Sequence, residues 1–310
     1  MEIVLILVLA LILDLVLGEP PNVWHPVAWL GKLMSFEIRL APRKGKIKQL
    51  TFGIAIVIIT LAAFTAAVYF LLNYLKEVNA ILHIIVSAVI FKFTFSLRGL
   101  IQAATVVRKL LSQDNLAEAR LNMRALVSRD TTNLDKRQVV AATVESVAEN
   151  SCDSFVAPLF YFSLFGVAGA VAYRIINTFD SMIGYYGDYE HLGKFAARLD
   201  DVANFIPARI AALLIVFSAW LCRRNISQAW HIMLRDHGKT QSPNAGWTMS
   251  AIAGALEIQL EKTGHYTLGD NYQSLTLNTI NASLQIITIT TIIWSLLILL
   301  ITQVIHYVAT

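Results

Sequence analysis

Long apolar runs separated by polar segments dominate the pattern of this chain. Four of these runs approach or exceed the length needed to cross the roughly 30 Å hydrocarbon core of a bilayer. They cover residues 3–17, which is marginal in length, 52–75, 81–97 and 286–308. Two further runs, 155–172 and 205–221, are interrupted by Pro, Gly or Arg. Each of these two is predicted to span the membrane, to enter it and return, or to pack inside the protein.

The composition agrees with a membrane-embedded chain. Hydrophobic residues make up 56% of the 310 residues and charged residues only 15%, unlike an ordinary soluble domain. We therefore predict an all-α, polytopic integral membrane protein with a single membrane-embedded domain over residues 1–310. Only Glu2 precedes the first apolar run and no small-residue cleavage site follows it, so we expect a retained anchor.

The basic residues predict an orientation. Lys and Arg gather in the segments 32–48, 98–137 and 223–239, and such segments stay on the cytoplasmic side. The N-terminus and the short hairpin at 76–77 are then expected outside. The segments before residue 155 and after residue 222 lie on one side, which requires an even number of crossings between them. Two full spans or one re-entrant hairpin satisfy this.

Shorter helices are predicted between the apolar runs. Residues 24–40 combine Trp and Phe with basic residues, which is typical of a helix at the membrane interface. Asp114 is expected to cap a helix over residues 116–126. Asp135 is the predicted N-cap of a helix that begins near Lys136.

This last helix carries an acidic stripe. Glu145, Glu149 and Asp153 recur every four residues, opposite a face formed by valines. One interpretation is the solvated side of an ordinary amphipathic helix. The other is a site for Mg²⁺ or a Mg-nucleotide, because like charges at this spacing repel and no Lys or Arg occurs between Arg137 and Arg174.

Three more polar groups follow along the chain. Asn177 and Asp180 would lie beside Asp153 if residues 155–172 fold back near 166–169. If the runs 155–172 and 205–221 are two full spans instead, Asp180 would lie outside, away from Asp153. Arg209 follows Asp200, Asp201 and Asn204, and it is expected either to pair with one of these aspartates or to contact a phosphate. The segment 235–247 is either a surface connection or a polar ligand site.

Several well-known site motifs are missing from the sequence. It contains no Gly-rich Lys-Ser/Thr phosphate loop, no strand followed by Gly-x-Gly-x-x-Gly, no His-Glu-x-x-His and no Gly-x-Ser-x-Gly. Composition and spacing alone thus predict a membrane protein with an acidic site on its cytoplasmic side, and they indicate no substrate.

The chain resembles a known family almost from end to end, the adenosylcobinamide-phosphate synthases, which are membrane amide ligases of cobalamin biosynthesis. The longest matching motifs are Glu-Ser-Val-Ala-Glu-Asn at 145–150, Asn-Thr-Phe-Asp-Ser-Met-Ile-Gly-Tyr at 177–185 and Ser-Pro-Asn-Ala-Gly at 242–246. Shorter ones lie at 14–20, 24–27, 128–130, 157–160, 172–174, 197–201 and 207–209. The chain departs from the family pattern at Tyr186, Gly187 and Asp188, where a basic residue is common, and at Glu19, where Asp is common.

The resemblance implies an ATP-dependent amide bond between adenosylcobyric acid and 1-amino-2-propanol or its O-phosphate. Mg²⁺ and ATP are the expected cofactor and co-substrate. The expected partners are these corrinoid and aminopropanol substrates, the lipid bilayer and other membrane enzymes of corrinoid assembly, but not nucleic acid. We expect the protein in the bacterial inner membrane, with its active site facing the cytoplasm.

Site roles are assigned by placing this chemistry on the family motifs. Glu149, Asp153 and Asp180 are the expected Mg²⁺ ligands and catalytic carboxylates, and Glu145 supports them or accepts the proton of the amine. Arg129 and Arg209 are expected to contact phosphate. The remaining predicted substrate-binding residues are Asn150, Asn177, Asp200, Asp201, Asn204, Ser242, Asn244 and Trp247.

Two other functions remain open from the sequence. A membrane phosphotransferase acting on a nucleotide-linked alcohol also places carboxylates at the cytoplasmic mouth of its helices. A sensor or transporter would use the acidic stripe to bind an ion, and it would not make an amide or turn over ATP.

Overall fold

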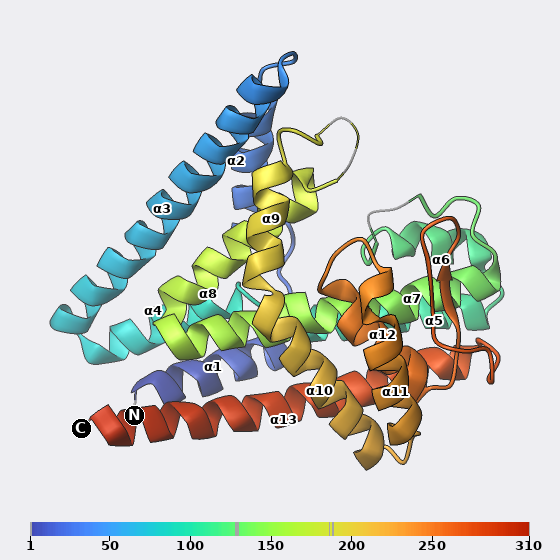
Figure 1. The fold of residues 1–310 in the computed structure, drawn as a ribbon. Coiled ribbons are helices and arrows are strands. Elements are labelled where there is room, and N and C mark those ends of the chain that lie inside the picture. The colour runs from blue at the N-terminus through green and yellow to red at the C-terminus, as the bar shows by residue number, and fades with distance from the viewer. Residues whose placement is uncertain (1, 128–129, 186, 188, 310) are drawn as a thin grey trace. The chain divides into compact units, whose positions relative to one another are not determined.

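The computed structural model describes residues 2–127, 130–185, 187 and 189–309. These residues are mostly helical, and Figure 1 shows the helices with their labels. Contacts divide the chain into two compact units. Unit 1 comprises residues 1–96, 157–203 and 297–310, and unit 2 comprises residues 97–156 and 204–296. Each unit is described below by itself.

The predicted fold class, a polytopic all-α membrane protein, is confirmed. Within the described residues, four helical stretches are long and apolar enough to cross a membrane, and these are Lys46–Val78, Ala80–Ser112, Lys136–Ile183 and Leu277–Val304. A fifth is possible if the bent pair Lys194–Ala203 and Phe205–Leu221, which meet at 49°, forms one span. The protein is therefore a multi-pass, all-α membrane protein.

Unit 1 is built around long apolar helices. Helix α1 (Glu2–Leu17) packs against α4 (Ala80–Lys92), and α3 (Lys46–Val78) packs along α8 (Ala157–Ile183) and α9 (Lys194–Ala203). The 16 residues of α1 have a length of about 24 Å at 1.5 Å per residue, so its crossing of a roughly 30 Å core stays a prediction. The predicted interfacial helix is α2 (Pro26–Arg39).

Helix α8 contains the break that the sequence suggested. Gly166 has a non-helical backbone with φ of +66° and ψ of −159°, and two helical parts of α8 meet at this kink (Figure 1). A positive φ is accessible to Gly without steric cost. The break falls inside the predicted fold-back at 166–169, and whether α8 enters the membrane and returns there stays a prediction.

Unit 2 surrounds one central helix, α7 (Lys136–Ser151). Asp135 caps it as predicted and forms a capping box with Gln138. Other helices of this unit are α5 (Leu97–Ser112), α6 (Leu116–Met123), α10 (Phe205–Leu221), α11 (Ile226–Asp236) and α12 (Ala245–Ala255). Helices α5, α6 and α12 pack against α7.

One expectation for unit 2 was wrong. Asn115, not Asp114, caps α6, since Asp114 has a φ of +54° and lies two residues before the helix begins. Of the two interpretations of the acidic stripe, a solvated helix side does not describe Glu145, whereas Glu149 is half-buried. Every side chain from Val139 to Ala148 is buried, including Glu145, which is only 4% exposed.

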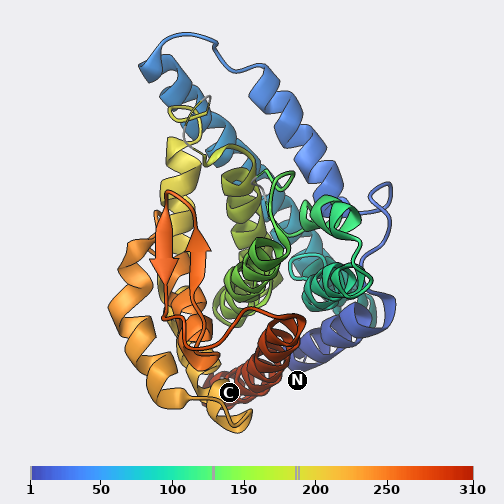
Figure 2. The same ribbon diagram turned by 90° about the vertical axis from the view of Figure 1, so that its right-hand side faces the viewer.

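A short antiparallel hairpin, β1 (Leu260–Lys262) and β2 (Tyr266–Leu268), was not predicted. Figure 2 shows its strands as two orange arrows. Strand β1 packs against α7, and β2 packs against α12 and the 3₁₀ turn His237–Lys239. The hairpin therefore belongs to the core of unit 2 and borders the polar segment 235–247.

Candidate functional site

The acidic stripe ends in an irregular helical turn. Directly after α7, Cys152–Val156 form a π-helical turn that contains Asp153. Pro158 follows it and has no N–H to donate to the carbonyl of Ser154, which favours a widened turn at this point. Such π turns occur frequently at functional sites. Glu149 and Asp153 are half-buried there, whereas Glu145 lies inside the core.

Two predicted amides lie beside this turn. The Asn150 side chain donates hydrogen bonds to the carbonyl and the hydroxyl oxygen of Ser146, at 2.9 and 3.0 Å. Asn204 is buried, and its Oδ1 lies 3.8 Å from the Cys152 thiol. Because α10 packs against the π turn, Asn204, the N-cap residue of α10, lies next to the turn that contains Asp153.

A second group of predicted residues forms around α12. The Arg209 guanidinium donates through Nη1 to the Phe205 carbonyl at 2.5 Å and to Asn244 Oδ1 at 3.2 Å. It lies over the rings of Phe205 and Trp247, 3.6 and 4.8 Å from their centroids. Ser242 Oγ accepts from the Asn244 N–H at 3.2 Å. The structure therefore joins Arg209, Ser242, Asn244 and Trp247 in one cluster.

The open ion pair of Arg209 with Asp200 or Asp201 would join residues of different units, so it stays a prediction. Within the described part of unit 2, no carboxylate lies within ion-pair distance of its guanidinium. Within unit 1, Asp201 accepts from Arg198 at 3.4 Å.

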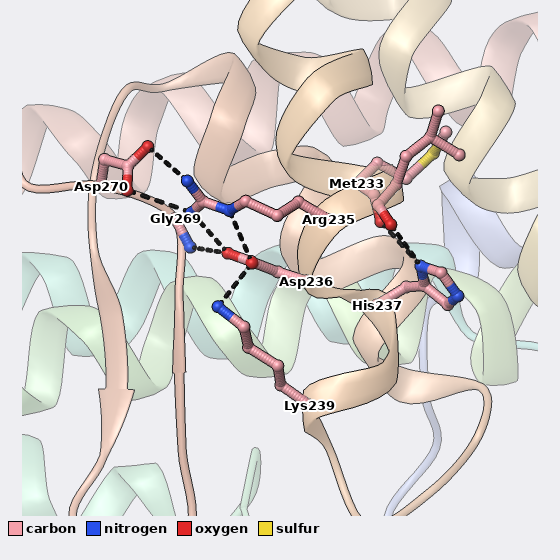
Figure 3. A network of polar contacts seen from close by, with 8 residues as sticks. Met233, Arg235, Asp236, His237, Lys239, Gly269 and Asp270 are labelled. Carbon is pink, nitrogen blue, oxygen red and sulfur yellow. Dashed lines mark hydrogen bonds and ion pairs between the residues drawn. The ribbon is translucent and has the colours of Figure 1, made fainter.

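The segment 235–247 holds an ion-pair network that the sequence did not predict in detail (Figure 3). Asp236 is fully buried, and its carboxylate accepts from Arg235 at 2.8 Å, from Lys239 at 2.6 Å and from the Gly269 N–H at 2.8 Å. Arg235 also donates two bonds of 3.0 Å to Asp270. The network ties the end of α11 to the end of the β-hairpin.

The charged groups in this network shift one another's pKa values. Burial raises the pKa of Asp236, but hydrogen bonds from Arg235, Lys239 and the Gly269 N–H outweigh it and lower the pKa to about 2. Hydrogen bonds to Asp236 and Asp270 raise the pKa of Arg235 above its usual value. Next to the network, the His237 ring lies against Trp247 with centroids 4.0 Å apart. The network therefore adjoins the Arg209 cluster through His237, which follows Asp236 in the chain and contacts Trp247.

The other predicted site residues belong to unit 1. Asn177 donates to Asp200 Oδ1 at 3.3 Å, linking α8 to α9. Asp180 lies one turn along α8 from Asn177, and a methyl group at Gly184 would meet its carboxylate. The structure thus gathers Asn177, Asp180, Asp200 and Asp201 near one helix junction. The predicted meeting of Asp180 with Asp153 joins residues of different units and stays a prediction.

The predicted magnesium site stays a prediction as well. Among the described residues, no group of three or more His, Cys, Asp or Glu is arranged to hold a metal ion. Mg²⁺ that arrives with a nucleotide commonly uses one or two carboxylates together with phosphate oxygens. Half-buried Glu149 and Asp153, on successive turns, fit that smaller requirement. Arg129 lies outside the described residues, as do Tyr186 and Asp188.

A buried charged cluster in unit 1 was missed from the sequence. Lys92 is 4% exposed and Asp14 1% exposed. The Lys92 ammonium lies 2.9 Å from the Glu19 carboxylate and 3.8 Å from that of Asp14. His25 Nε2 contacts Glu19 at 2.7 Å, while His25 Nδ1 accepts the Val27 N–H and caps α2. A lysine inside the apolar run 81–97 was the signal that could have revealed it.

This cluster keeps Glu19 ionised. Burial raises the pKa of Glu19, but hydrogen bonds from His25, Ser96 and Lys92 outweigh it and lower the pKa to about 2. The backbone N–H at His25 Nδ1 assigns the ring proton to Nε2, which then donates to Glu19. The cluster thus joins α1, α2 and α4 by charge-assisted contacts.

Comparison with known proteins identifies the family. The family model described as CobD/Cbib protein matches residues 7–296. The chain belongs to this family. A cobalamin biosynthesis protein CobD of Dehalococcoides mccartyi is 55% identical over 284 residues, which cover 92% of each chain. A probable cobalamin biosynthesis protein CobD of Methanothermobacter thermautotrophicus is 43% identical, over 86% of each chain.

The likeness extends to more distant archaeal relatives. A probable cobalamin biosynthesis protein CobD of Methanocaldococcus jannaschii is 38% identical over 86% of this chain and 88% of the relative. No solved structure is significantly similar to the chain. The match of residues 7–296 contains every predicted site residue of both units, so the family resemblance stated from the motifs is confirmed.

Proposed function

We propose that this protein acts in cobalamin biosynthesis by forming an amide between adenosylcobyric acid and 1-amino-2-propanol or its O-phosphate, at the expense of ATP. The product is adenosylcobinamide or its phosphate. The observation that carries this proposal is membership of the CobD/Cbib protein family over residues 7–296. Three relatives, 55%, 43% and 38% identical to this chain, are named as cobalamin biosynthesis proteins or probable ones.

The reaction has two bond-forming stages. The propionate carboxylate of the corrinoid first attacks the γ-phosphorus of ATP, which forms an acyl phosphate and releases ADP. The neutral amine then attacks the acyl carbon, forms the C–N bond and releases inorganic phosphate and a proton. Phosphoryl transfer depends mainly on positioning and charge neutralisation. The protein therefore needs carboxylates that hold Mg-ATP and cations that hold phosphate oxygens.

Unit 2 offers both kinds of group on adjacent elements. Glu149 and Asp153 lie half-buried on α7 and its π turn, and they are the residues that would hold the magnesium of Mg-ATP. Mg²⁺ supplies neutralisation of the charge that develops on the phosphoryl oxygens. The cluster of Arg209 and Asn244 lies around α12, which packs on α7. Buried Glu145 is proposed as the support for these carboxylates.

The membrane supplies the setting for the reaction. The chain is a multi-pass protein with at least four candidate spans in its described residues. We propose that it resides in the inner membrane with the polar ends of unit 2 toward the cytoplasm, where ATP is available. Other membrane enzymes of corrinoid assembly are proposed partners.

The test is amide formation by the purified protein in detergent. Adenosylcobyric acid, ATP, Mg²⁺ and each amine are supplied together and then omitted one at a time, and product is identified by mass together with ADP release. We expect product only in the complete mixture. A phosphotransferase would transfer an alcohol phosphate without forming the amide, and a sensor would bind ligand without releasing ADP. Either result would refute the proposal.

A cellular test compares two precursors: cobyric acid, which lacks the aminopropanol amide, and cobinamide, which already contains it. Cells that lack this protein and any second ligase are expected to fail to make complete cobamide from cobyric acid, yet to succeed when given cobinamide. Growth of such cells on cobyric acid would contradict the assignment.

A further inference from the structure

Among the described residues of unit 2, Arg209 has no anionic partner. Its hydrogen bonds in the described structure both leave from Nη1 and go to neutral oxygens, the Phe205 carbonyl and Asn244 Oδ1. A guanidinium has five N–H donors in a fixed fork, so donors on Nε and Nη2 remain for another molecule. A partly buried cation normally needs a counter-charge, and here unit 2 supplies none within its described residues.

Two aromatic rings fix the orientation of this guanidinium. The Phe205 and Trp247 rings lie 3.6 and 4.8 Å from it, and such contacts stabilise the cation without neutralising it. The Asn244 amide holds it from a third direction. Because the guanidinium is already ordered, the Arg209 side chain loses little conformational entropy when an anion binds.

Trp247 provides a second donor without an acceptor. Its Nε1–H is buried and has no hydrogen-bond partner in the described structure. Its ring is held by His237 on one side, with centroids 4.0 Å apart. His237 is fixed in turn by hydrogen bonds from Nδ1 to the Met233 and Leu234 carbonyls, both of 3.1 Å (Figure 3). An unpaired buried donor on a rigid ring is the kind of group that a ligand oxygen satisfies.

The start of α12 adds positive potential at the same place. Asn244 is the N-cap residue of this 11-residue helix, but its side chain makes no capping hydrogen bond and serves Arg209 instead. The N-terminus of a helix is its positive pole. The nearby cations Arg235 and Lys239 are bound to Asp236 and Asp270, whereas Arg209 has no such partner among the described residues of unit 2.

We propose that Arg209, the Trp247 Nε1–H and the start of α12 form a subsite for a phosphate group of a substrate. A phosphate presents several acceptor oxygens, which suits donors that arrive from two side chains and a helix end. The source of this phosphate rests on the proposed function: it belongs either to ATP or to 1-amino-2-propanol O-phosphate. Phosphate recognition itself is common to both.

Direct binding measurements test the subsite without requiring turnover. Titration calorimetry in detergent uses three probes: ATP, 1-amino-2-propanol O-phosphate and free 1-amino-2-propanol. The variants are Arg209→Gln, Arg209→Lys and Trp247→Phe, and the last keeps an aromatic ring but removes the N–H. The matched controls are Arg224→Gln and Trp230→Phe, two exposed residues of the same unit. Thermal melting confirms that each variant is folded.

The phosphate-bearing ligand should lose affinity in a graded way. We expect about a tenfold loss for Trp247→Phe, which removes one hydrogen bond to a charged group. A loss of about 30-fold or more is expected for Arg209→Gln, with a smaller loss for Arg209→Lys, because Lys keeps the charge but not the fork. Affinity for free aminopropanol and both control variants should stay unchanged.

The outcomes distinguish ATP from 1-amino-2-propanol O-phosphate as the source of the phosphate. They also distinguish failure of the subsite from failure of the proposed amide formation. Losses confined to ATP assign the nucleotide phosphate, and losses confined to aminopropanol phosphate assign the amine. Unchanged affinity for both phosphate ligands in folded Arg209→Gln and Trp247→Phe overturns the subsite, even if the wild-type protein makes the amide. Graded losses of phosphate affinity in a protein that makes no amide would support the subsite and refute the proposed reaction.

Discussion

Asp236 is the residue whose replacement should destabilise unit 2 most clearly. Its carboxylate is fully buried and receives donors from Arg235, Lys239 and the Gly269 N–H. Asp236→Asn keeps the size of the side chain but removes the charge that three donors converge on. The end of α11 and the end of the β-hairpin then lose their common anchor.

The magnitude follows from the protonation of this group. A pKa lowered from its ordinary value of 3.8 to about 2 corresponds to about 2 kcal/mol of stability at neutral pH. Loss of one partner of a buried charge network can cost more, about 3–5 kcal/mol. We therefore expect Asp236→Asn to lower Tm by at least about 4 °C, on the scale known for domains of 150–250 residues.

The assay is thermal unfolding in detergent followed by circular dichroism, with a pH series. Because the folded pKa of Asp236 is depressed, its contribution is complete above the unfolded pKa near 4 and is lost as pH falls toward about 2. The Tm difference between wild type and Asp236→Asn should shrink over this window. Asp114→Asn is the control, since its pair with Lys136 is exposed and exposed pairs contribute little. Equal Tm values for wild type and Asp236→Asn at pH 7 would refute this reasoning.

The remaining predictions concern unit 1, the acidic turn and the topology. Lys92→Met should lower Tm by several degrees because it leaves two carboxylates without their buried cation, at a cost of about 3–5 kcal/mol; a Tm equal to wild type would contradict the ion-pair role. Glu149→Gln and Asp153→Asn should each abolish ligation while Tm stays within about 2 °C of wild type, since both side chains are half-buried; full ligation activity in both variants would return the stripe to a structural role. Single cysteines at 76 should react with a membrane-impermeant thiol reagent in intact cells, whereas cysteines within 32–48 should not, and the reverse pattern would invert the predicted orientation.

The sequence by itself determined the long apolar helices of this protein and its family, but not the β-hairpin. Apolar runs of sufficient length become helices because a bilayer core leaves no other way to satisfy the backbone of a single segment. The N-cap at Asp135 is local, because its side chain accepts from the Gln138 N–H three residues away, and the sequence predicted this cap. The break in α8 was likewise visible, because Gly166 is one of the few residues in that run able to adopt a positive φ.

Tertiary structure decided the environment of each charged group. The sequence left open whether the stripe of Glu145 is solvated, and packing of α5, α6, α12 and β1 against α7 accompanies the burial of Glu145. Distant parts of the chain supply the Gly269 N–H to Asp236, Asp270 to Arg235, and Asp14 and Glu19 to Lys92. Helical periodicity shows which face a residue occupies, but only packing decides what covers that face, because burial and charge pairing depend on contacts between elements that sequence spacing does not encode.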